Sequence, residues 1–345
     1  MSDFHSALAG RKLTWLVTGS AGFIGSHLLE ALLRLGQRVV SVDDLSTGKR
    51  ENLGEVEQAV GTAAWKRHRF MEGSIADPQL CRAACRNVDI VLHQAALGSV
   101  PRSIADPLAT HMANVTGFVN MLVAARDARA RFVYASSSAT YGDHPALPKS
   151  EGVIGGALSP YAVSKQANEL YAGVFARCYG VETVGMRYFN VFGARQDPES
   201  AYAAVIPRWV RAMLVGAPVE INGDGETSRD FCYVANAVQA NLRAALIDEP
   251  RAFNRVYNVA VGESTSLNRL FEILRGLLGE QRSELRAAKP VHLPFRAGDV
   301  RHSLADISLA RELLGYAPTH TLTSGLREAL SWYMNRFAST AAIAG

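Results

Sequence analysis

Short runs of apolar and β-branched residues alternate with longer amphipathic segments through the first two thirds of this 345-residue chain. The short runs predict strands at 13–18, 38–43, 88–94, 131–136 and 182–188. The segments between them predict helices at 23–35, 110–128 and 161–179. Several strand runs, such as LTWLVT and VDIVLHQ, are almost uninterrupted by polar residues, which is typical of strands buried on both faces. The alternation therefore predicts an α/β fold with a parallel sheet between two layers of helices.

The pattern loosens after about residue 190, where glycine and proline become more frequent and the strands shorten. We interpret 12–190 as the larger domain. Segments 191–235 and 263–337 are expected to form a smaller C-terminal α/β lobe that holds the substrate. Segment 236–262 contains one more helix and one more strand, and we expect it to return to the larger domain.

A glycine-rich turn, Gly19-Ser20-Ala21-Gly22-Phe23-Ile24-Gly25, joins the first predicted strand to the first predicted helix. Its glycines permit a tight turn and let the backbone approach a diphosphate, and the helix N-terminus favours the phosphate charge. The second strand ends in Asp43, whose carboxylate can accept both hydroxyls of an adenosine ribose and would repel a 2′-phosphate. The order of these features predicts a Rossmann-type, doubly wound domain that binds NAD in preference to NADP.

A second set of residues carries the candidate chemistry. Ser136, Ser137 and Ser138 end a predicted strand, and Tyr161 and Lys165 are four residues apart, hence on one helix face. A free phenol has a pKa near 10, but a neighbouring ammonium and the positive nicotinamide favour the phenolate. The pair therefore predicts a general base at neutral pH, with a serine hydroxyl at the reacting oxygen.

The charge and the cysteine content of the chain limit the partners and the cellular compartment that we expect. The formal net charge of +4 is small and spread along the chain, which favours small anions over nucleic acid as partners. The four cysteines show neither a disulfide rhythm nor metal-ligand spacing, so we expect no metal and a reducing cytoplasm. We find no long uninterrupted apolar run and no secretory pattern at the start, so neither a membrane span nor export is expected.

These motifs resemble the extended short-chain dehydrogenases/reductases, specifically the nucleotide-sugar 4-epimerases. TGSAGFIGSHL, HQAALGSVPRSI, SSSATYGDHP, SPYAVSKQANE, RYFNVFGARQDP and GDGETSRDF match that family in order, and the similarity extends from about residue 12 to about residue 335. The UDP-N-acetylglucosamine 4-epimerases are the most similar subgroup. The resemblance implies reversible 4-epimerisation of UDP-GlcNAc and UDP-GalNAc through a 4-keto intermediate, in the synthesis of surface polysaccharide precursors.

The resemblance also implies residue roles. Tyr161 takes the 4-hydroxyl proton while NAD⁺ takes hydride from carbon 4, the keto sugar rotates, and hydride returns to its other face. Lys165 holds the nicotinamide ribose, and Ser138 bridges the sugar oxygen and Tyr161, with Ser137 as the fallback. The implied NAD contacts are Gly19, Gly22, Phe23, Ile24, Asp43, Asp44, Ser46, Thr47, Gly48, Ser74, Ile75, Gln94, Ala95, Ala96, Tyr161, Lys165 and Tyr188. Ser74 departs from the family, which usually has an aspartate near the adenine amine at this position.

A UDP-sugar needs cationic or donor groups for its diphosphate and a stacking or polar pocket for its uracil. The implied substrate contacts are Gly98, Ser99, Ser137, Ser138, Asn190, Ala204, Val205, Trp209, Arg229, Arg296, Asp299 and Ser303. The residue aligned with Ser303 lies against the substituent on carbon 2 of the sugar, where a bulky tyrosine leaves room for a hydroxyl only. The small serine of this chain therefore predicts that N-acetylated sugars are accepted.

Alternatives remain open at this point. UDP-glucose/UDP-galactose or UDP-hexosaminuronate could be the substrate pair. A nucleotide-sugar 4,6-dehydratase is disfavoured because its Asp-Glu pair is replaced here by Ala139 and Thr140. A non-catalytic NAD-binding sensor is disfavoured by the intact serine, tyrosine and lysine. The family pairs the helices predicted at 110–128 and 161–179 with those of a second copy, so we expect a homodimer.

Overall fold

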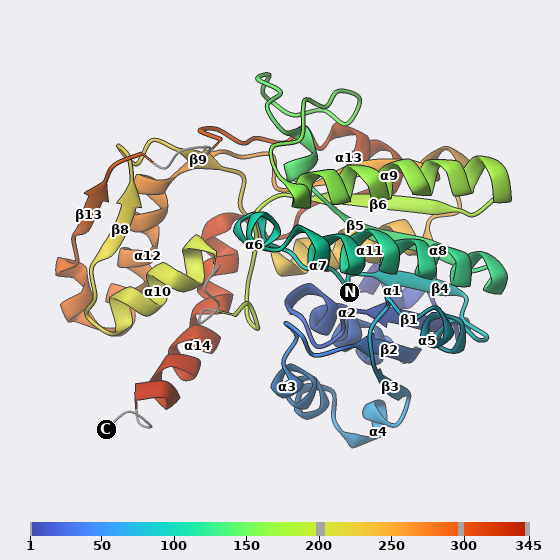
Figure 1. Ribbon diagram of the computed structural model, residues 1–345. Helices are drawn as coiled ribbons and strands as arrows, with labels where there is room; N and C mark the ends of the chain where they lie inside the picture. The colour runs from blue at the N-terminus through green and yellow to red at the C-terminus, as the bar shows by residue number, and fades with distance from the viewer. Residues whose placement is uncertain (1, 198–203, 296–299, 342–345) are drawn as a thin grey trace.

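The computed structural model describes residues 2–197, 204–295 and 300–341, and a seven-stranded parallel sheet organises its larger lobe (Figure 1). The strand order is β11-β6-β5-β4-β1-β2-β3. The strands are β1 (Thr14–Thr18), β2 (Arg38–Asp43), β3 (His68–Glu72), β4 (Ile90–His93), β5 (Arg131–Ser137), β6 (Thr183–Tyr188) and β11 (Arg255–Val259). The order reverses between β1 and β4, as in doubly wound sheets that bind nucleotides. The predicted fold class is confirmed.

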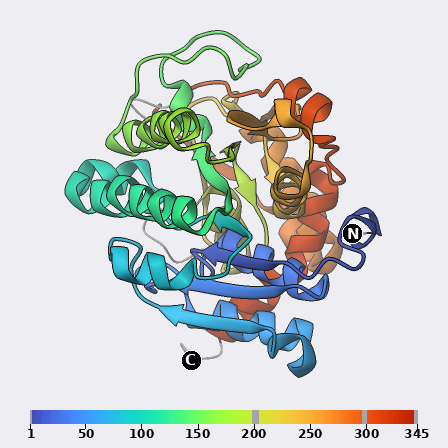
Figure 2. The same cartoon turned by 90° about the vertical axis from the view of Figure 1, so that its right-hand side faces the viewer.

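Helices cover both faces of the sheet. One layer contains α2 (Phe23–Arg34), α11 (Val234–Leu246) and α13 (Ser308–Leu314), and α3 (Arg50–Val60) and α4 (Thr62–Trp65) pack outside it. The other layer contains α5 (Pro78–Ala84), α8 (Gly117–Ala128) and α9 (Pro160–Tyr179). Figure 2 shows α8 and α9, in teal and green, on one side of the sheet. Each layer buries its own apolar cluster, which explains why the central strands read as continuous hydrophobic runs.

The helix expected at 110–128 differs from the prediction at its start. Asp106 accepts a hydrogen bond from Ala109 N, and Pro107 occupies the first turn, so helix α7 (Pro107–His111) begins three residues earlier. A π-helical turn, η1 (Met112–Thr116), then joins α7 to α8. By length and composition alone, the continuous stretch Pro107–Ala128 could cross a membrane. In this fold α8 packs on α5, α9 and the sheet.

Strand β3 has no counterpart among the predicted strands. Its five residues, HRFME, include no fully buried side chain, because β3 lies at the edge of the sheet and pairs only with β2. The alternation that marks a half-buried strand is therefore weak here.

The smaller lobe has a separate apolar core. It contains α10 (Val205–Leu214), β8 (Val219–Asn222), α12 (Leu267–Gln281), β13 (Pro290–Leu293) and α14 (Leu322–Ala341), with β8 and β13 paired in parallel. Its buried aromatic residues include Trp209 and Tyr333. Segment 236–262 contributes most of α11 and all of β11 to the larger lobe. The remaining short elements are α1 (Ser2–Ala7), α6 (Val100–Ala105), η2 (Ser138–Tyr141), β7 (Val191–Phe192), β9 (Ser228–Arg229), β10 (Cys232–Tyr233), η3 (Pro250–Ala252), β12 (Thr265–Ser266) and η4 (Ser283–Ala287).

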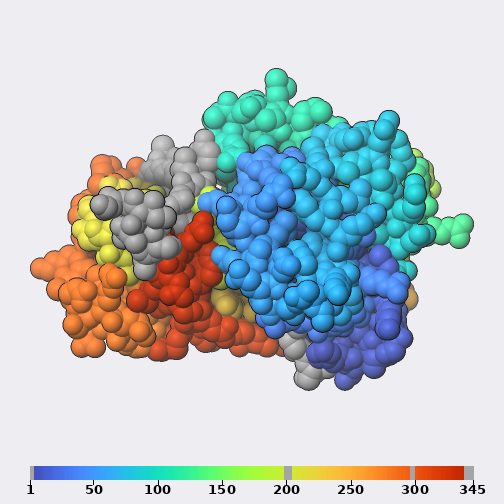
Figure 3. All heavy atoms as spheres, turned by 90° about the horizontal axis from the view of Figure 1, so that it is seen from below, coloured from blue at the N-terminus to red at the C-terminus, as the bar shows by residue number. Residues whose placement is uncertain are grey.

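Polar contacts join the two lobes beside the sheet edge. The guanidinium of Arg195 pairs with Glu30 of α2 and, at 3.5 Å, with Glu55 of α3. Trp332 of α14 donates its indole N–H to Glu55 at 2.9 Å. Figure 3 shows the red C-terminal segment lying against the blue N-terminal lobe. These contacts connect the smaller lobe to the larger one.

Candidate active site

A cavity of about 320 Å³ lies at the carboxyl edge of the sheet, at the point where the strand order reverses. The expected cofactor residues on its wall are Gly19, Gly22, Phe23, Ile24, Asp43, Asp44, Ser46, Thr47, Ser74, Ile75, Gln94, Ala95, Ala96, Tyr161, Lys165 and Tyr188. Gly48 instead lines a neighbouring cavity between the lobes. The structure thus brings residues from six separate segments together on the wall of one cavity.

The glycine turn shapes the floor of this cavity. Gly19 has φ +70°, and a Cβ there would lie 2.8 Å from the backbone nitrogen of Ala95. A Cβ at Gly25 would lie 2.0 Å from the carbonyl oxygen of Gly19, so α2 can approach the turn only with glycine at that position. The N-cap of α2 is Gly22, so no side chain covers the first N–H groups of the helix. This arrangement fits the diphosphate of a dinucleotide.

Asp43 lies at the end of β2, on the side of the cavity where the adenosine is expected. Its carboxylate accepts hydrogen bonds from Ala21 N at 2.9 Å and from Leu45 N at 2.8 Å, which fixes its orientation. Burial raises the pKa of this carboxyl, although the two backbone hydrogen bonds oppose the shift. The oxygens have further lone pairs, so the site can still accept ribose hydroxyls. Ser74 lies on the same cavity wall, and its role near adenine stays a prediction.

The tyrosine and lysine lie where the nicotinamide end is expected. Helix α9 begins at Pro160, and the Ser159 hydroxyl caps it by accepting from Ala162 N at 3.1 Å. Tyr161 therefore sits in the first turn and Lys165 one turn later, and both line the cofactor cavity. The Lys165 ammonium lies 5.9 Å from the centre of the Tyr161 ring and donates to the Ala135 carbonyl at 2.8 Å.

Of the two candidate serines, the fallback Ser137 lies beside the phenol, and whether it or the preferred Ser138 meets the sugar oxygen stays a prediction. Ser137 is the last residue of β5, and its side chain forms a hydrogen bond with that of Tyr161. Ser138 begins the 3₁₀ turn η2, where the chain leaves the strand direction. Both serines line the adjoining sugar cavity. The direction of this turn decides which hydroxyl meets the phenol, and the sequence pattern alone did not reveal it.

Burial has the largest effect on the pKa of both Tyr161 and Lys165. It raises the pKa of Tyr161, and the Ser137 hydrogen bond opposes that rise. It also lowers the pKa of Lys165 to about 8, against the influence of Glu169 on the same helix. Burial therefore disfavours the phenolate of Tyr161, and the expectation that Lys165 and a bound nicotinamide favour it stays a prediction.

A second cavity, of about 650 Å³, adjoins Tyr161 on the side away from the glycine turn. The expected substrate residues on its wall are Gly98, Ser99, Ser137, Ser138, Asn190, Arg229 and Ser303. Sequence reasoning missed Lys149, Leu158, Arg208 and Val300, which also line it. Lys149 reaches the cavity only because its backbone N–H pairs with the Leu304 carbonyl at 2.8 Å, a contact without a local sequence signal.

A third cavity, of about 280 Å³, continues into the smaller lobe. Its walls include Asn190, Ala204, Val205, Trp209 and Arg229, all expected substrate contacts. Trp209 is 1% exposed and donates its indole N–H to the Glu220 carbonyl, so the ring belongs mainly to the lobe core. Arg296 and Asp299 lie outside the described residues. Within the described segments, His, Cys, Asp and Glu form no group of three that could hold a metal.

Comparison with known proteins gives one family. The model of the NAD dependent epimerase/dehydratase family matches residues 15–260. The UDP-glucose 4-epimerase of Mycolicibacterium smegmatis is 36% identical over 324 residues, which cover 93% of this chain and 98% of that relative. The description of the family names NAD, which confirms the cofactor prediction.

Two solved structures share the architecture. The UDP-N-acetylglucosamine 4-epimerase from Methanobrevibacter ruminantium, in complex with UDP-N-acetylmuramic acid, is 37% identical with a TM-score of 0.86. The UDP-glucose 4-epimerase from Thermotoga maritima, with UDP-glucose, is 35% identical with a TM-score of 0.84. Each comparison covers 94% of this chain and 99% of the other.

Proposed function

This chain belongs to the NAD-dependent epimerase/dehydratase family, and we propose that it is a nucleotide-sugar 4-epimerase that interconverts UDP-N-acetylglucosamine and UDP-N-acetylgalactosamine. One observation carries the choice of sugar. Ser303 lies on the wall of the same 650 Å³ cavity as Tyr161, and the resemblance places the residue at this position against the carbon-2 substituent of the sugar. A serine at this position leaves space for an acetamido group.

The residues around the phenol would divide the chemistry among them. Bound NAD supplies a nicotinamide that accepts a hydride from carbon 4 and returns it. Tyr161 takes the proton of the 4-hydroxyl and later gives a proton back to the oxygen of the 4-keto sugar. Ser137 hydrogen-bonds the reacting oxygen and the phenol, and Lys165 holds the nicotinamide ribose. The 650 Å³ cavity would give the 4-keto sugar room to turn over.

Other groups would bind the nucleotide diphosphate. Arg208 and Arg229 both line the sugar cavity and the cavity of the smaller lobe, so they lie where the two meet. A guanidinium matches phosphate oxygens in a bidentate way. Arg229 is oriented by its hydrogen bonds to the carbonyls of Ser228 and Arg301. We assign the uridine to the cavity beyond these two arginines, against Val205.

The experiment is an NMR panel. Purified protein is mixed, without added NAD, with UDP-hexoses, UDP-N-acetylhexosamines and their uronates. The proposal expects the two N-acetylhexosamines to interconvert fastest. Faster conversion of UDP-glucose/UDP-galactose or of the uronates would replace the proposed substrate with that pair. A 6-deoxy-4-keto product would mean dehydration, which Ala139 and Thr140 disfavour because neither can act as an acid.

We also propose a homodimer of this enzyme in the cytoplasm, serving the synthesis of surface polysaccharide precursors. Helices α6, α7 and α9 contact one another and carry exposed apolar side chains, among them Ile104 (64% exposed), Leu108 (78%) and Leu170 (72%). Exposed apolar side chains gathered on neighbouring helices favour association with another protein surface. A second copy would cover this helical face.

A further inference from the structure

The catalytic helix α9 is bound to the end of strand β5 at three successive positions. Lys165 donates to the carbonyl of Ala135, and Tyr161 is hydrogen-bonded to Ser137. Both of these contacts involve groups that the proposed reaction uses. Ser136, which lies between Ala135 and Ser137, also contacts α9. Its partner there is a residue to which the proposed chemistry gives no role.

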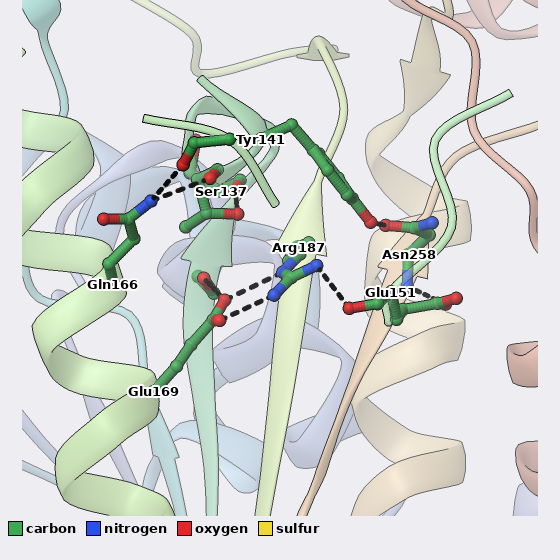
Figure 4. A network of polar contacts seen from close by, with 10 residues as sticks. Ser137, Tyr141, Glu151, Gln166, Glu169, Arg187 and Asn258 are labelled. Atoms are coloured by element: carbon green, nitrogen blue, oxygen red, sulfur yellow. Dashed lines mark hydrogen bonds and ion pairs between the residues drawn. The ribbon is translucent and has the colours of Figure 1, made fainter. Parts of the chain in front are cut away.

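That residue is Glu169, one turn beyond Lys165 on the same face of the helix. Its Oε1 accepts from the Ser136 hydroxyl at 2.5 Å and from Arg187 Nε at 2.9 Å, and its Oε2 accepts from Arg187 Nη2 at 2.7 Å. Figure 4 shows Glu169 reaching from the helix to Arg187 on the neighbouring strand. The side chains of Glu169 and Arg187 are only 13% and 4% exposed. A two-point charge pair this well shielded fixes both side chains.

We propose that Glu169 is a positioning residue for the epimerase reaction, holding Tyr161 and Lys165 against the serine strand through Ser136 and Arg187. The inference rests on the proposed function for the identity of the reaction. Glu169 lines neither the cofactor cavity nor the sugar cavity, so it acts through the residues that it holds.

Besides holding α9 in place, the carboxylate of Glu169 influences the pKa of Lys165. Burial disfavours the ammonium and lowers its pKa to about 8, and the carboxylate of Glu169 opposes that shift. The other groups facing Lys165 give it no negative charge: Tyr161 is a phenol with a raised pKa, and His93 on β4 is kept neutral by a pKa of about 3. Neutralising Glu169 also leaves the positive charge of Arg187 uncompensated nearby. Lys165 should then lose its proton at lower pH.

The same network reaches the back of the sugar cavity. Arg187 donates to the Glu151 carbonyl at 3.1 Å and stacks over the Tyr141 ring at 4.8 Å. The Tyr141 hydroxyl donates to Asn258, which in turn donates to the Lys149 carbonyl at 2.9 Å. Figure 4 shows the contacts of Arg187 with Glu151 and of Tyr141 with Asn258. Two walls of the active site, α9 and the Lys149 segment, are thus tied to one ion pair.

The test uses Glu169→Gln in the full-length protein with its bound NAD. Lysine is labelled with ¹³C at Cε, and the Lys165 resonance among the six lysines is assigned with Lys165→Met and titrated with pH. The inference expects the Lys165 midpoint to fall by about one pH unit. It also expects kcat to fall about tenfold, KM to stay within about twofold, and the alkaline limb of the pH–rate profile to move down with Lys165. An unchanged midpoint together with unchanged kcat would overturn it.

Two further variants distinguish a positioning role of Glu169 from a role in the stability of the fold alone. The double variant Glu169→Gln/Arg187→Met removes both buried charges, so it should recover thermal stability relative to the single variant but not kcat. Recovery of kcat with stability would mean a purely structural role, and this variant also serves if the single variant does not fold. Glu182→Gln, which breaks the Arg131 pair before β6, is the matched control and should leave the Lys165 titration unchanged. The titration needs no sugar substrate, so it is read even if the proposed activity fails.

Discussion

At the residue scale, the proposed choice of sugar depends on the side chain at position 303. Ser303 and Tyr161 share one cavity, and the Ser303 backbone N–H is held by the Ser228 carbonyl at 3.1 Å, so a larger side chain there would project from a fixed backbone. Specificity for a single substituent in such a pocket is worth about 1–3 kcal/mol.

Ser303→Tyr is therefore expected to lower kcat/KM for UDP-N-acetylglucosamine relative to UDP-glucose by about tenfold to hundredfold. The measurement is the ratio of the two kcat/KM values in wild type and variant. Ser303→Ala is the matched control and should keep the wild-type ratio within about twofold, because it adds no volume. A Ser303→Tyr ratio equal to that of the wild type would remove the basis for the proposed sugar.

The positions of site residues that depend on one short segment could be predicted from the sequence. The positions of residues that depend on the direction of a turn could not. Gly19, Asp43, Tyr161 and Lys165 depend on spacing within one strand–turn–helix or one helix, and the structure brings them to a single cavity. The choice between Ser137 and Ser138 depends on how the chain leaves β5, which no spacing encodes.

At the element scale, three histidines have lowered pKa values: His93 is buried, and His27 and His68 are half-buried. Burial lowers the pKa of His27 on α2 to about 4, that of His68 on β3 to about 4 and that of His93 on β4 to about 3. In the unfolded chain these imidazoles titrate near 6.5. Below that pH the unfolded state binds more protons than the folded state, so stability is full above 6.5 and is lost as pH falls.

The free energy of unfolding is therefore expected to fall between pH 7 and pH 5, by about 2 kcal/mol for the buried His93 and by at most about that much for each of the half-buried His27 and His68. His93→Gln keeps a polar partner for the Thr18 hydroxyl, which bonds His93 at 2.9 Å, and should reduce this fall by about that amount. Denaturant unfolding at the two pH values is the measurement. Replacing the exposed His5 by Gln is the control, and an equal fall in wild type and His93→Gln would contradict the expectation.

The elements also show where periodicity is informative. The buried strands and α9 follow from continuous apolar runs and helical spacing, whereas β3 and the π-helical turn η1 do not. Strand β3 is an edge strand with little burial, and η1 is a local change of winding within an otherwise regular amphipathic stretch. Neither changes the hydrophobic pattern enough to be detected.

At the scale of the whole molecule, the proposed dimer depends on the apolar face of α6, α7 and α9. Leu170→Glu places a charge in the middle of this face and should halve the mass measured by light scattering at micromolar concentration. Val215→Glu places the same charge on the smaller lobe, where Val215 is 58% exposed, and should leave the mass unchanged. A monomeric wild type, or a variant that stays dimeric, would contradict the proposed interface.

The lobes themselves could be anticipated only in outline. The loss of periodicity after residue 190 marks the smaller lobe, but its contact with α3 through Trp332 and Glu55 joins residues 277 positions apart. The same is true of the cavity walls formed by Lys149 and Arg208, which depend on long-range packing.

The most direct test of the whole account is the rate at which carbon 4 of UDP-N-acetylglucosamine inverts, followed by NMR with purified wild type and Tyr161→Phe. The variant keeps the ring and loses only the hydroxyl, so it should fold, retain NAD by absorbance and lose at least about a hundredfold in rate. Inversion by Tyr161→Phe at the wild-type rate, with NAD bound, would show that some other group moves the proton and would contradict the account.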